Sequence, residues 1–548
     1  MAAVTSTPPS AQPLLAQDVL SPSSGVCFER KMGDTEASYF LPSRQTGVND
    51  MYLHLGFRAE EHVVDPARVR AVWAILRLRH PLLAASVKMH EYDDIRFVYK
   101  APASSRDLLQ EADANLEYQT RGKDALIDTY LNGPRTLSNT RLSYLIVSQP
   151  TEDEAGSLTP PLTPPLETAS NGAPAETRQY DLLICAMHFI GDGMALHQFA
   201  NDFFTLLGSE KTTSELESQL ESEWSERWAN IDDDAQIIPS ALEDNIPIKW
   251  SKLRGAAARI DFDMVQQKQI GGQSFPRRKH SERRTVVPTL SFPEDKTKAM
   301  LKKCKANGVS ISAALFAVCG VAWARMGLGS KELPLLMYSA LNLRSSFSAN
   351  RQSLWDSYWF LAIGYFNVIL PNFLPADKAQ HEPIFWHRAR QAKEQSTRAA
   401  KHPLLISRTH EMAKDRGSRA RAWAKEDDDK EKGVWTPPTP PLDTTPAPKQ
   451  PPREPVLPAR VKASASALIG LSLLGNLDGV YKHAAFPSIQ LHTLTTGSRQ
   501  RHGAMLLFGY TFARKLWVSL GYDENGFSEG VVERFWSESV GVLEEFLG

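Results

Sequence analysis

The sequence predicts a mixed α/β fold (α+β layers) built from two core-sized units. Short apolar segments typical of buried strands occur together with amphipathic helical segments in both halves of the chain. The 548 residues also exceed what one ordinary hydrophobic core accommodates. We therefore expect two core-sized units joined by connecting material.

In the first half, Asp65 and Pro66 predict a helix start, because an N-cap carboxylate precedes a first-turn proline. Apolar residues then recur at helical spacing, namely Val69, Val72, Trp73 and Leu76. Pro81 ends the helix, and residues 82–89 lead into a strand-like stretch. Residues 142–147 and 180–187 are short apolar segments between breakers, which predicts two neighbouring buried strands.

In the second half, strands are predicted over 285–292, 333–340, 359–370 and 515–522, with helices over 296–305 and from Ser310 onward. The chain ends in an amphipathic helix, for which Ser528 is the expected N-cap. Its apolar stripe consists of Val532, Phe535, Trp536, Leu543 and Phe546.

Three segments lack the composition of a packed core. Residues 1–24 are rich in Pro, Ser and Ala, and 150–178 and 414–458 carry Thr-Pro-Pro repeats, the last after a charge run. We expect all three to be disordered, the two internal ones as surface insertions. The predicted organisation is an N-terminal lobe (25–240), a crossover linker (241–284) and a C-terminal lobe (285–548). The Thr-Pro-Pro tracts have either no function or a docking or phosphorylation role.

Composition excludes several classes of protein. The 62 Lys and Arg residues nearly cancel the 63 Asp and Glu residues, so the net charge does not indicate a nucleic-acid-binding protein. The four cysteines are far apart in the sequence, which argues against a zinc site or a disulfide framework and favours a reducing compartment. The N-terminus lacks the pattern of a signal peptide, and the apolar run 309–324 is too short to cross a bilayer. We expect a cytoplasmic monomer with no membrane span and no metal.

His188 is the strongest candidate for chemistry. It follows an apolar strand and precedes a helix that begins after Asp192 and Gly193, a position where open α/β layers place reactive side chains. Gly191 and Gly193 are expected to allow a sharp backbone turn. A neutral imidazole here can accept a proton from a hydroxyl or amine. The alternatives are that His188 is a hydrogen-bonded core histidine and that Asp192 is an ordinary N-cap.

The segment His188 to Gly193, HFIGDG, resembles the HxxxDG signature of the chloramphenicol-acetyltransferase-like superfamily. That superfamily includes the BAHD acyltransferases, peptide-synthetase condensation domains and fungal secondary-metabolite O-acyltransferases. Four other stretches resemble it in the expected order: Arg79 to Leu83, Asn342 to Arg344, Gly364 to Pro371, and Leu474 to Asp478. The overall pattern looks most like fungal trichothecene 15-O-acetyltransferase-like enzymes.

The resemblance implies two similar mixed-sheet lobes with a tunnel between them, His188 at its middle, and donor and acceptor entering from opposite ends. It also implies that Asp192 pairs with Arg344 and that the pair is architectural. Two departures matter. Met187 stands where condensation domains usually have a first histidine, which favours a free-standing coenzyme A enzyme. The DFGWG motif of plant BAHD enzymes is absent.

The resulting hypothesis is an acyl-CoA-dependent O-acyltransferase, acetyl transfer in the simplest case, with no bound cofactor and a small secondary metabolite as acceptor. Candidates for oxyanion or substrate contact are Asn367 and the Gly193 amide; alternatively, Asn367 satisfies nearby backbone. The cluster Arg277-Arg278-Lys279 with Arg283-Arg284 is either a basic rim for coenzyme A or, as we prefer, a solvated linker. Two other functions stay open: a condensation-type enzyme with a carrier-protein thioester donor, and a non-catalytic component of a biosynthetic complex.

Overall fold

The structure is a computed structural model. It describes residues 26–151, 176–229, 236–246, 248, 251–279, 282–347, 353–437 and 465–548. The predicted disordered N-terminus, residues 152–175 of the first Thr-Pro-Pro insertion and residues 438–458 of the second lie outside these residues.

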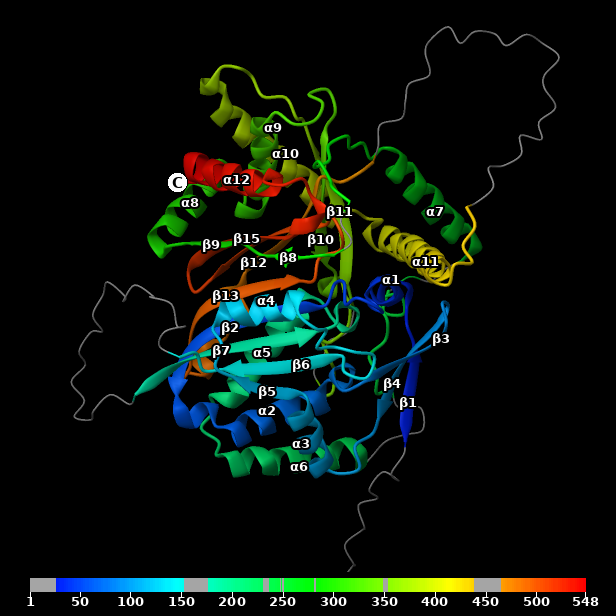
Figure 1. Ribbon diagram of the computed structural model, residues 1–548, viewed down its shortest axis with the longest axis vertical. Helices are drawn as coiled ribbons and strands as arrows, with labels where there is room; N and C mark the ends of the chain where they lie inside the picture. The colour runs from blue at the N-terminus through cyan, green and yellow to red at the C-terminus, as the bar shows by residue number, and fades with distance from the viewer. Residues whose placement is uncertain are drawn as a thin grey trace, which may run out of the picture.

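The first lobe is built on a five-stranded sheet with strand order β13-β2-β7-β6-β5. Its strands are β2 (Met51–Glu60), β5 (Leu116–Gln119), β6 (Ser143–Ser148), β7 (Thr177–Ala186) and β13 (Gln490–Ser498). The helices of this lobe are α2 (Pro66–Arg79), α3 (Ser105–Ala114), α4 (Lys123–Asn132), α5 (Gly193–Leu207) and α6 (Thr213–Ala229) (Figure 1). Strands β6 and β7 pair antiparallel, with Leu145 opposite Ile184, which confirms the two predicted neighbouring strands.

Helix α2 forms where the sequence predicts it. The Asp65 side chain accepts hydrogen bonds from the backbone N–H groups of Ala67 and Arg68, and Pro66 occupies the first turn. The helix ends at Arg79, two residues before Pro81. Its apolar residues, including Val69, are fully buried in the core of the first lobe.

The second lobe is built on a seven-stranded mixed sheet with strand order β11-β10-β12-β14-β15-β8, and β9 pairs with β15. The strands are β8 (Thr285–Val286), β9 (Thr289–Phe292), β10 (Leu335–Asn342), β11 (Ile363–Leu370), β12 (Ile469–Asn476), β14 (Met505–Phe512) and β15 (Lys515–Asp523). Its helices are α8 (Glu294–Ala306), α9 (Ile311–Met326), α10 (His381–Ala400) and α12 (Val531–Leu547). The predicted strand 285–292 is thus two short strands, with Val287 and Pro288 between them.

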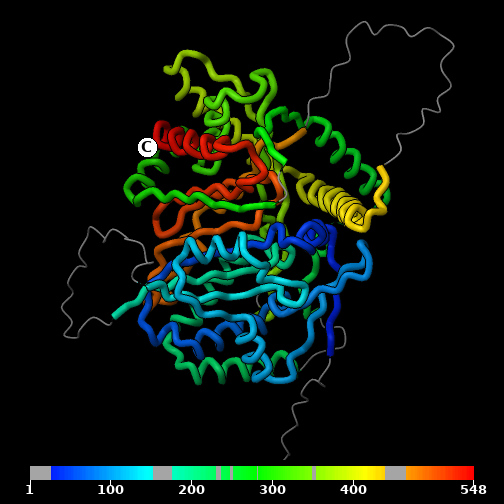
Figure 2. Tube along the Cα trace, viewed as in Figure 1, coloured from blue at the N-terminus to red at the C-terminus, as the bar shows by residue number. Residues whose placement is uncertain are grey.

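The boundary between the lobes is not a single point in the sequence. Strand β13 comes from the predicted C-terminal lobe but pairs antiparallel with β2, so it completes the sheet of the first lobe. In Figure 2 the orange β13 segment lies against the blue β2 segment. Its Leu491 and Leu494 side chains are buried in the first core. The predicted assignment of all of 285–548 to the second lobe is therefore wrong for this strand.

Two further predictions are corrected by helices. Residues 405–431 form α11 (Leu405–Glu431), although an insertion was expected from 414 onward. Small buried residues at helical spacing, including Gly417 and Ala420, let α11 pack on α1 (Asp34–Ser43), and Glu426–Lys430 is an i,i+4 ion pair on its surface. The predicted linker contains α7 (Lys252–Gln267), which packs on α11. Strand β7 begins at Thr177, so the last two residues of the predicted 150–178 insertion belong to a strand.

Smaller features complete the fold. Strands β1 (Cys27–Lys31), β3 (Ser86–Glu91) and β4 (Asp94–Lys100) form a separate three-stranded sheet in the order β1-β4-β3. Helix α12 begins after Gly530, whose φ of 72° is left-handed, and not after Ser528 as predicted.

Within the described ranges, no single helix is long and apolar enough to span a bilayer. Helices α8 and α9 reach the required length and apolarity only when taken together, and they are separated by a 90° bend.

Candidate active site

His188 stands between strand β7 and helix α5, in the short 3-10 helix His188–Ile190. Its neighbours Met187, Phe189 and Ile190 are fully buried in the first core, so this segment is anchored on both sides of the histidine. The His188 side chain is one wall of a cavity of about 540 Å³. The sequence prediction that His188 follows a buried strand and precedes a helix is confirmed.

Both lobes line the His188 cavity. The first lobe contributes Tyr39, Met194 and Leu196, and the second contributes apolar residues from its sheet, including Leu341, Leu473, Leu506 and Phe508. The cavity therefore lies where the two lobes meet, and its walls combine these apolar side chains with polar and charged ones, among them Arg344, Arg416 and Arg501. Such a mixed surface suits a small molecule that carries polar groups.

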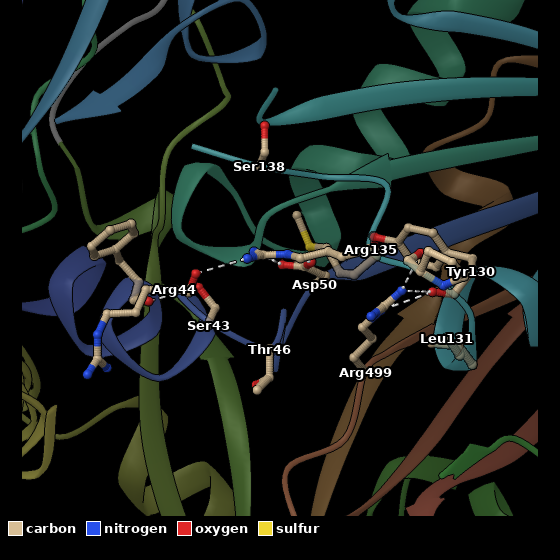
Figure 3. Close-up of polar contacts among 12 residues, drawn as sticks. Ser43, Arg44, Thr46, Asp50, Tyr130, Leu131, Arg135, Ser138 and Arg499 are labelled. Carbon is tan, nitrogen blue, oxygen red and sulfur yellow. Dashed lines mark hydrogen bonds and ion pairs between the residues drawn. The ribbon is translucent and has the colours of Figure 1, made fainter. Parts of the chain in front are cut away.

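One side of the cavity is formed by a loop around Asn49 and by the residues that follow β13, among them Gln500 and Arg501. Figure 3 shows the polar contacts that hold this region. The buried Asp50 carboxylate pairs with Arg135 at 2.7 Å, and the Arg499 guanidinium donates to the Tyr130 carbonyl oxygen at 2.6 and 2.9 Å. These contacts tie three distant segments of the chain together beside the cavity.

The hydrogen bonding of His188 fixes which ring nitrogen is available. Its Nδ1 lies 3.1 Å from the carbonyl oxygen of Gly191. A carbonyl oxygen only accepts, so Nδ1 carries the proton in the neutral ring and Nε2 is left as the acceptor. Burial lowers the pKa of His188 below its usual 6.5, which keeps the ring neutral at physiological pH. A neutral imidazole with an acceptor Nε2 is the form that a general base requires.

Tyr39, which the sequence did not single out, packs directly on the histidine. The two rings stack with centroids 4.3 Å apart and an interplanar angle of 26°. Tyr39 lies on α1, far from His188 in the sequence, and its hydroxyl contacts the hydroxyl of Tyr365 on β11. No local motif marks Tyr39, so only the tertiary structure reveals it.

Asp192 and Arg344 lie together, as the resemblance implied. Nη1 of Arg344 contacts both carboxylate oxygens of Asp192, at 2.7 and 2.8 Å. Nη2 instead donates to the backbone carbonyl oxygens of Tyr358 and Phe360. The contact is thus made by one guanidinium nitrogen to both carboxylate oxygens, and not by two nitrogens in parallel.

The Asp192 carboxylate serves three further backbone donors. It accepts from the N–H groups of Met194 and Ala195 at the start of α5, and from Ala362 just before β11. It is therefore an N-cap and a partner of Arg344 at the same time. The two roles that were considered for Asp192 from the sequence are thus compatible. Asp192 is only 3% exposed, so the carboxylate faces its partners and holds the loop that carries His188.

The two glycines of the motif have different roles from the one expected. Gly191 is extended, with φ −177° and ψ 179°, so no left-handed turn is needed there. A Cβ at Gly191 would lie 2.6 Å from the buried ring of Trp359, so close packing requires glycine. Gly193 begins α5 and lines the cavity, and a Cβ there would meet only Leu474, at 3.4 Å. The Gly193 N–H is in the first turn of α5, where backbone donors lack helical partners.

Other resembling stretches support the site from a distance. Nδ1 of the buried His80 lies 3.0 Å from Ser357 Oγ, and the His80 ring contacts Tyr358, so this motif holds the segment whose carbonyls accept from Arg344. Asp478 accepts from the backbone N–H groups of Ala513 and Arg514, which both have positive φ. His80 and Asp478 thus act on the backbone and lie outside the cavity walls, whereas Leu474, at the start of the last stretch, lines the His188 cavity.

Two predicted contacts are not at the His188 cavity. Asn367 on β11 lines a neighbouring cavity and donates to Gln269 Oε1 at 3.2 Å, so it does not face His188 as an oxyanion donor. Tyr365 lies two residues earlier on the same face of β11, and of these two residues only Tyr365 also lines the His188 cavity. Of the predicted basic rim, Arg278 bonds Asn525 and Arg284 pairs with Glu524. The members of that cluster line neither cavity.

Comparison with known proteins adds evidence on the fold. No protein-family model matches the chain, and no curated protein matches it. Among solved structures, TRI3 trichothecene 15-O-acetyltransferase from Fusarium sporotrichioides is similar with a TM-score of 0.68 at 12% identity, covering 98% of this chain and 100% of that one. The chain has the chloramphenicol-acetyltransferase-like, two-lobed fold.

Further matches with this fold are more distant. The condensation domain from a monacolin K polyketide synthase gives a TM-score of 0.54 at 9% identity, covering 96% of this chain and 98% of that one. The epimerization domain from the third module of tyrocidine synthetase B gives 0.52 at 13% identity, covering 96% and 99%. The similarity in fold to each of these proteins extends over nearly the whole length of both chains.

Proposed function

We propose that this protein is an acyltransferase that moves an acyl group from acyl-CoA to the hydroxyl of a small-molecule acceptor, with His188 as general base. The observation that carries the proposal is the hydrogen bond from His188 Nδ1 to the Gly191 carbonyl. It leaves Nε2 as a proton acceptor in a cavity that both lobes line. The likeness in fold to an acetyltransferase supports the same class of reaction.

In the proposed reaction the acceptor oxygen attacks the thioester carbonyl while its proton moves to His188 Nε2. The new C–O bond forms a tetrahedral oxyanion directly, without an acyl-enzyme. The C–S bond then breaks, and the imidazolium returns the proton to the leaving thiolate. The Gly193 N–H, in the first turn of α5, is the proposed donor to the oxyanion, since the positive end of a helix favours negative charge.

The test incubates the purified protein with a panel of acyl-CoA donors and alcohols and follows release of free thiol. We expect thiol release that depends on the alcohol, and a loss of roughly 10²- to 10⁴-fold in His188→Ala with normal folding. Wild-type turnover in His188→Ala would remove this histidine from the mechanism. A second assay offers the acyl group as a thioester on the phosphopantetheine of a carrier protein, because a condensation domain has a similar fold. Turnover in this assay alone would mean that the acyl donor is a carrier protein and not coenzyme A.

A further inference from the structure

A second cavity, of about 320 Å³, adjoins the His188 cavity. It is lined by residues of α7, α10, α11 and β11. The two cavities share the wall residues Ile363, Tyr365 and Arg416, so only side chains separate them. The contact between the Tyr39 and Tyr365 hydroxyls lies in this partition.

Arg416, on α11, is the charged member of the partition. Its guanidinium carbon lies 4.4 Å from the ring centroid of Tyr365 and 5.4 Å from that of Tyr39. Its buried Nε has no hydrogen-bond partner, and no carboxylate of the described residues forms an ion pair with it. The guanidinium also interacts with the Tyr39 hydroxyl, but stacking on aromatic rings uses its face, so the in-plane Nε–H stays available for an acceptor.

The other charges around the two cavities do not compensate Arg416. The Asp192 carboxylate at the His188 cavity is engaged by Arg344 at 2.7 Å. At the second cavity, Arg398 and Arg408 already pair with Glu394 and Asp261.

Arg501, which also lines the His188 cavity, likewise has no ion-pair partner among the described residues. The described walls of the joined cavities thus carry surplus positive charge, and Arg416 is at the junction. Arg501 is exposed, whereas Arg416 is partly buried and its Nε is fully buried, so leaving the Arg416 charge unpaired is costly and a bound anion would reduce that cost.

We propose that Arg416 binds a carboxylate carried by one of the two substrates, a role that rests on the proposed acyl transfer. The planar fork of a guanidinium matches the two oxygens of a carboxylate, and two tyrosine rings hold this fork in place. Tyr39 contacts both Arg416 and His188, so the bound carboxylate lies close to the reacting carbonyl. The carboxylate belongs either to a dicarboxylic acyl group or to a hydroxy-acid acceptor.

The experiment measures binding by calorimetry, so it does not depend on turnover. The donor arm compares succinyl-CoA with butanoyl-CoA, which has the same four-carbon chain but no carboxylate. The acceptor arm compares 3-phenyllactate with its methyl ester. We expect the acid to bind roughly tenfold or more tightly than its neutral partner in one arm, the size of a charge-assisted hydrogen bond. That arm identifies the source of the carboxylate.

Arg416→Gln should reduce the preference to less than about threefold. Arg419→Gln is the matched control, because Arg419 is on the same helix, pairs with Asp415 and lines neither cavity. If Arg416→Gln does not fold, Arg416→Lys keeps the charge without the fork and should still lower the preference by roughly threefold.

Equal binding of acid and neutral ligand in both arms, or a preference of wild-type size in the Arg416 variants, overturns the inference and leaves acyl transfer standing. Conversely, Arg416-dependent binding without any thiol release supports the carboxylate site and contradicts the proposed reaction.

Discussion

The imidazole of His188 stacks on the phenol ring of Tyr39, with centroids 4.3 Å apart. Together with the bond from Nδ1 to Gly191, this contact restricts both the rotation and the tilt of the ring. One contact comes from the histidine's own loop, and the other from α1 near the start of the described chain. A base positioned from two directions is held ready for proton transfer without reorganisation.

Removing the Tyr39 ring should slow the reaction and change its pH dependence. Burial lowers the pKa of His188 below 6.5, so the neutral base persists as pH falls, and we expect the acid limb of kcat/KM below pH 6.5. In Tyr39→Ala, water reaches the imidazole, so the pKa of His188 should rise and the acid limb of the kcat/KM profile should move up toward pH 6.5. Because the ring is no longer held in place, kcat should fall by roughly 10- to 100-fold. Tyr39→Phe keeps the stack and is the control. An unchanged limb in Tyr39→Ala would show that the tyrosine does not shield His188.

Replacing Arg344 should destabilise the protein, because Asp192 would be buried without its cationic partner. We expect Arg344→Met to lower the free energy of unfolding by about 3 kcal/mol, the cost of breaking a buried ion pair. Adding Asp192→Asn should recover part of that loss, since the unpaired charge is gone. Arg398→Met removes an exposed arginine from an ion pair on α10 and should change stability by less than about 1 kcal/mol. Chemical denaturation of the four proteins checks this, and wild-type stability in Arg344→Met would contradict it.

The two motif glycines should respond differently to alanine. Gly191→Ala places a Cβ against Trp359, which is itself fully buried and cannot move aside, so we expect a loss of about 1 to 3 kcal/mol and a displaced His188. Gly193→Ala meets an ordinary contact with Leu474 and should keep near-normal stability. Denaturation midpoints and kcat measure the two effects. Equal behaviour of the two variants would argue against the packing explanation.

The sequence predicted the features that depend on local pattern. Helix α2 has its cap in Asp65, the β6 and β7 strands are continuous apolar runs, and His188 and Asp192 lie in one short motif. The pairing of Asp192 with Arg344 followed from the family resemblance, although its single-nitrogen geometry did not.

The predictions that were wrong or missing concern features that depend on tertiary contacts. Strand β13 could not be assigned to the first sheet, because its partner β2 is more than 400 residues away along the chain. The charge run in α11 looked like a solvated insertion, since the Gly417 and Ala420 stripe has meaning only against α1. Tyr39 and Arg416 belong to no motif, and only the packing of α1, β11 and α11 around one cavity brings them to His188.

His197 should make the protein sensitive to acid. It is 1% exposed on α5, its Nδ1 lies 2.9 Å from the Tyr481 hydroxyl, and burial lowers its pKa from 6.5 to about 3. The unfolded chain therefore takes up a proton below pH 6.5 that the folded chain refuses until about pH 3. The stability that His197 contributes is complete above pH 6.5 and is lost as pH falls through that window, by about 2 kcal/mol at pH 5.

The measurement compares urea unfolding at pH 7.5 and pH 5.0 in the wild type and in His197→Gln. The variant lacks this titrating ring, so its free energy of unfolding should fall by about 2 kcal/mol less between the two pH values. His62→Gln removes an exposed histidine and should keep the wild-type difference. The other buried histidines are present in every protein, so their contributions cancel in the comparison. If His197→Gln loses as much stability at pH 5.0 as the wild type does, proton uptake at His197 is not a source of acid sensitivity.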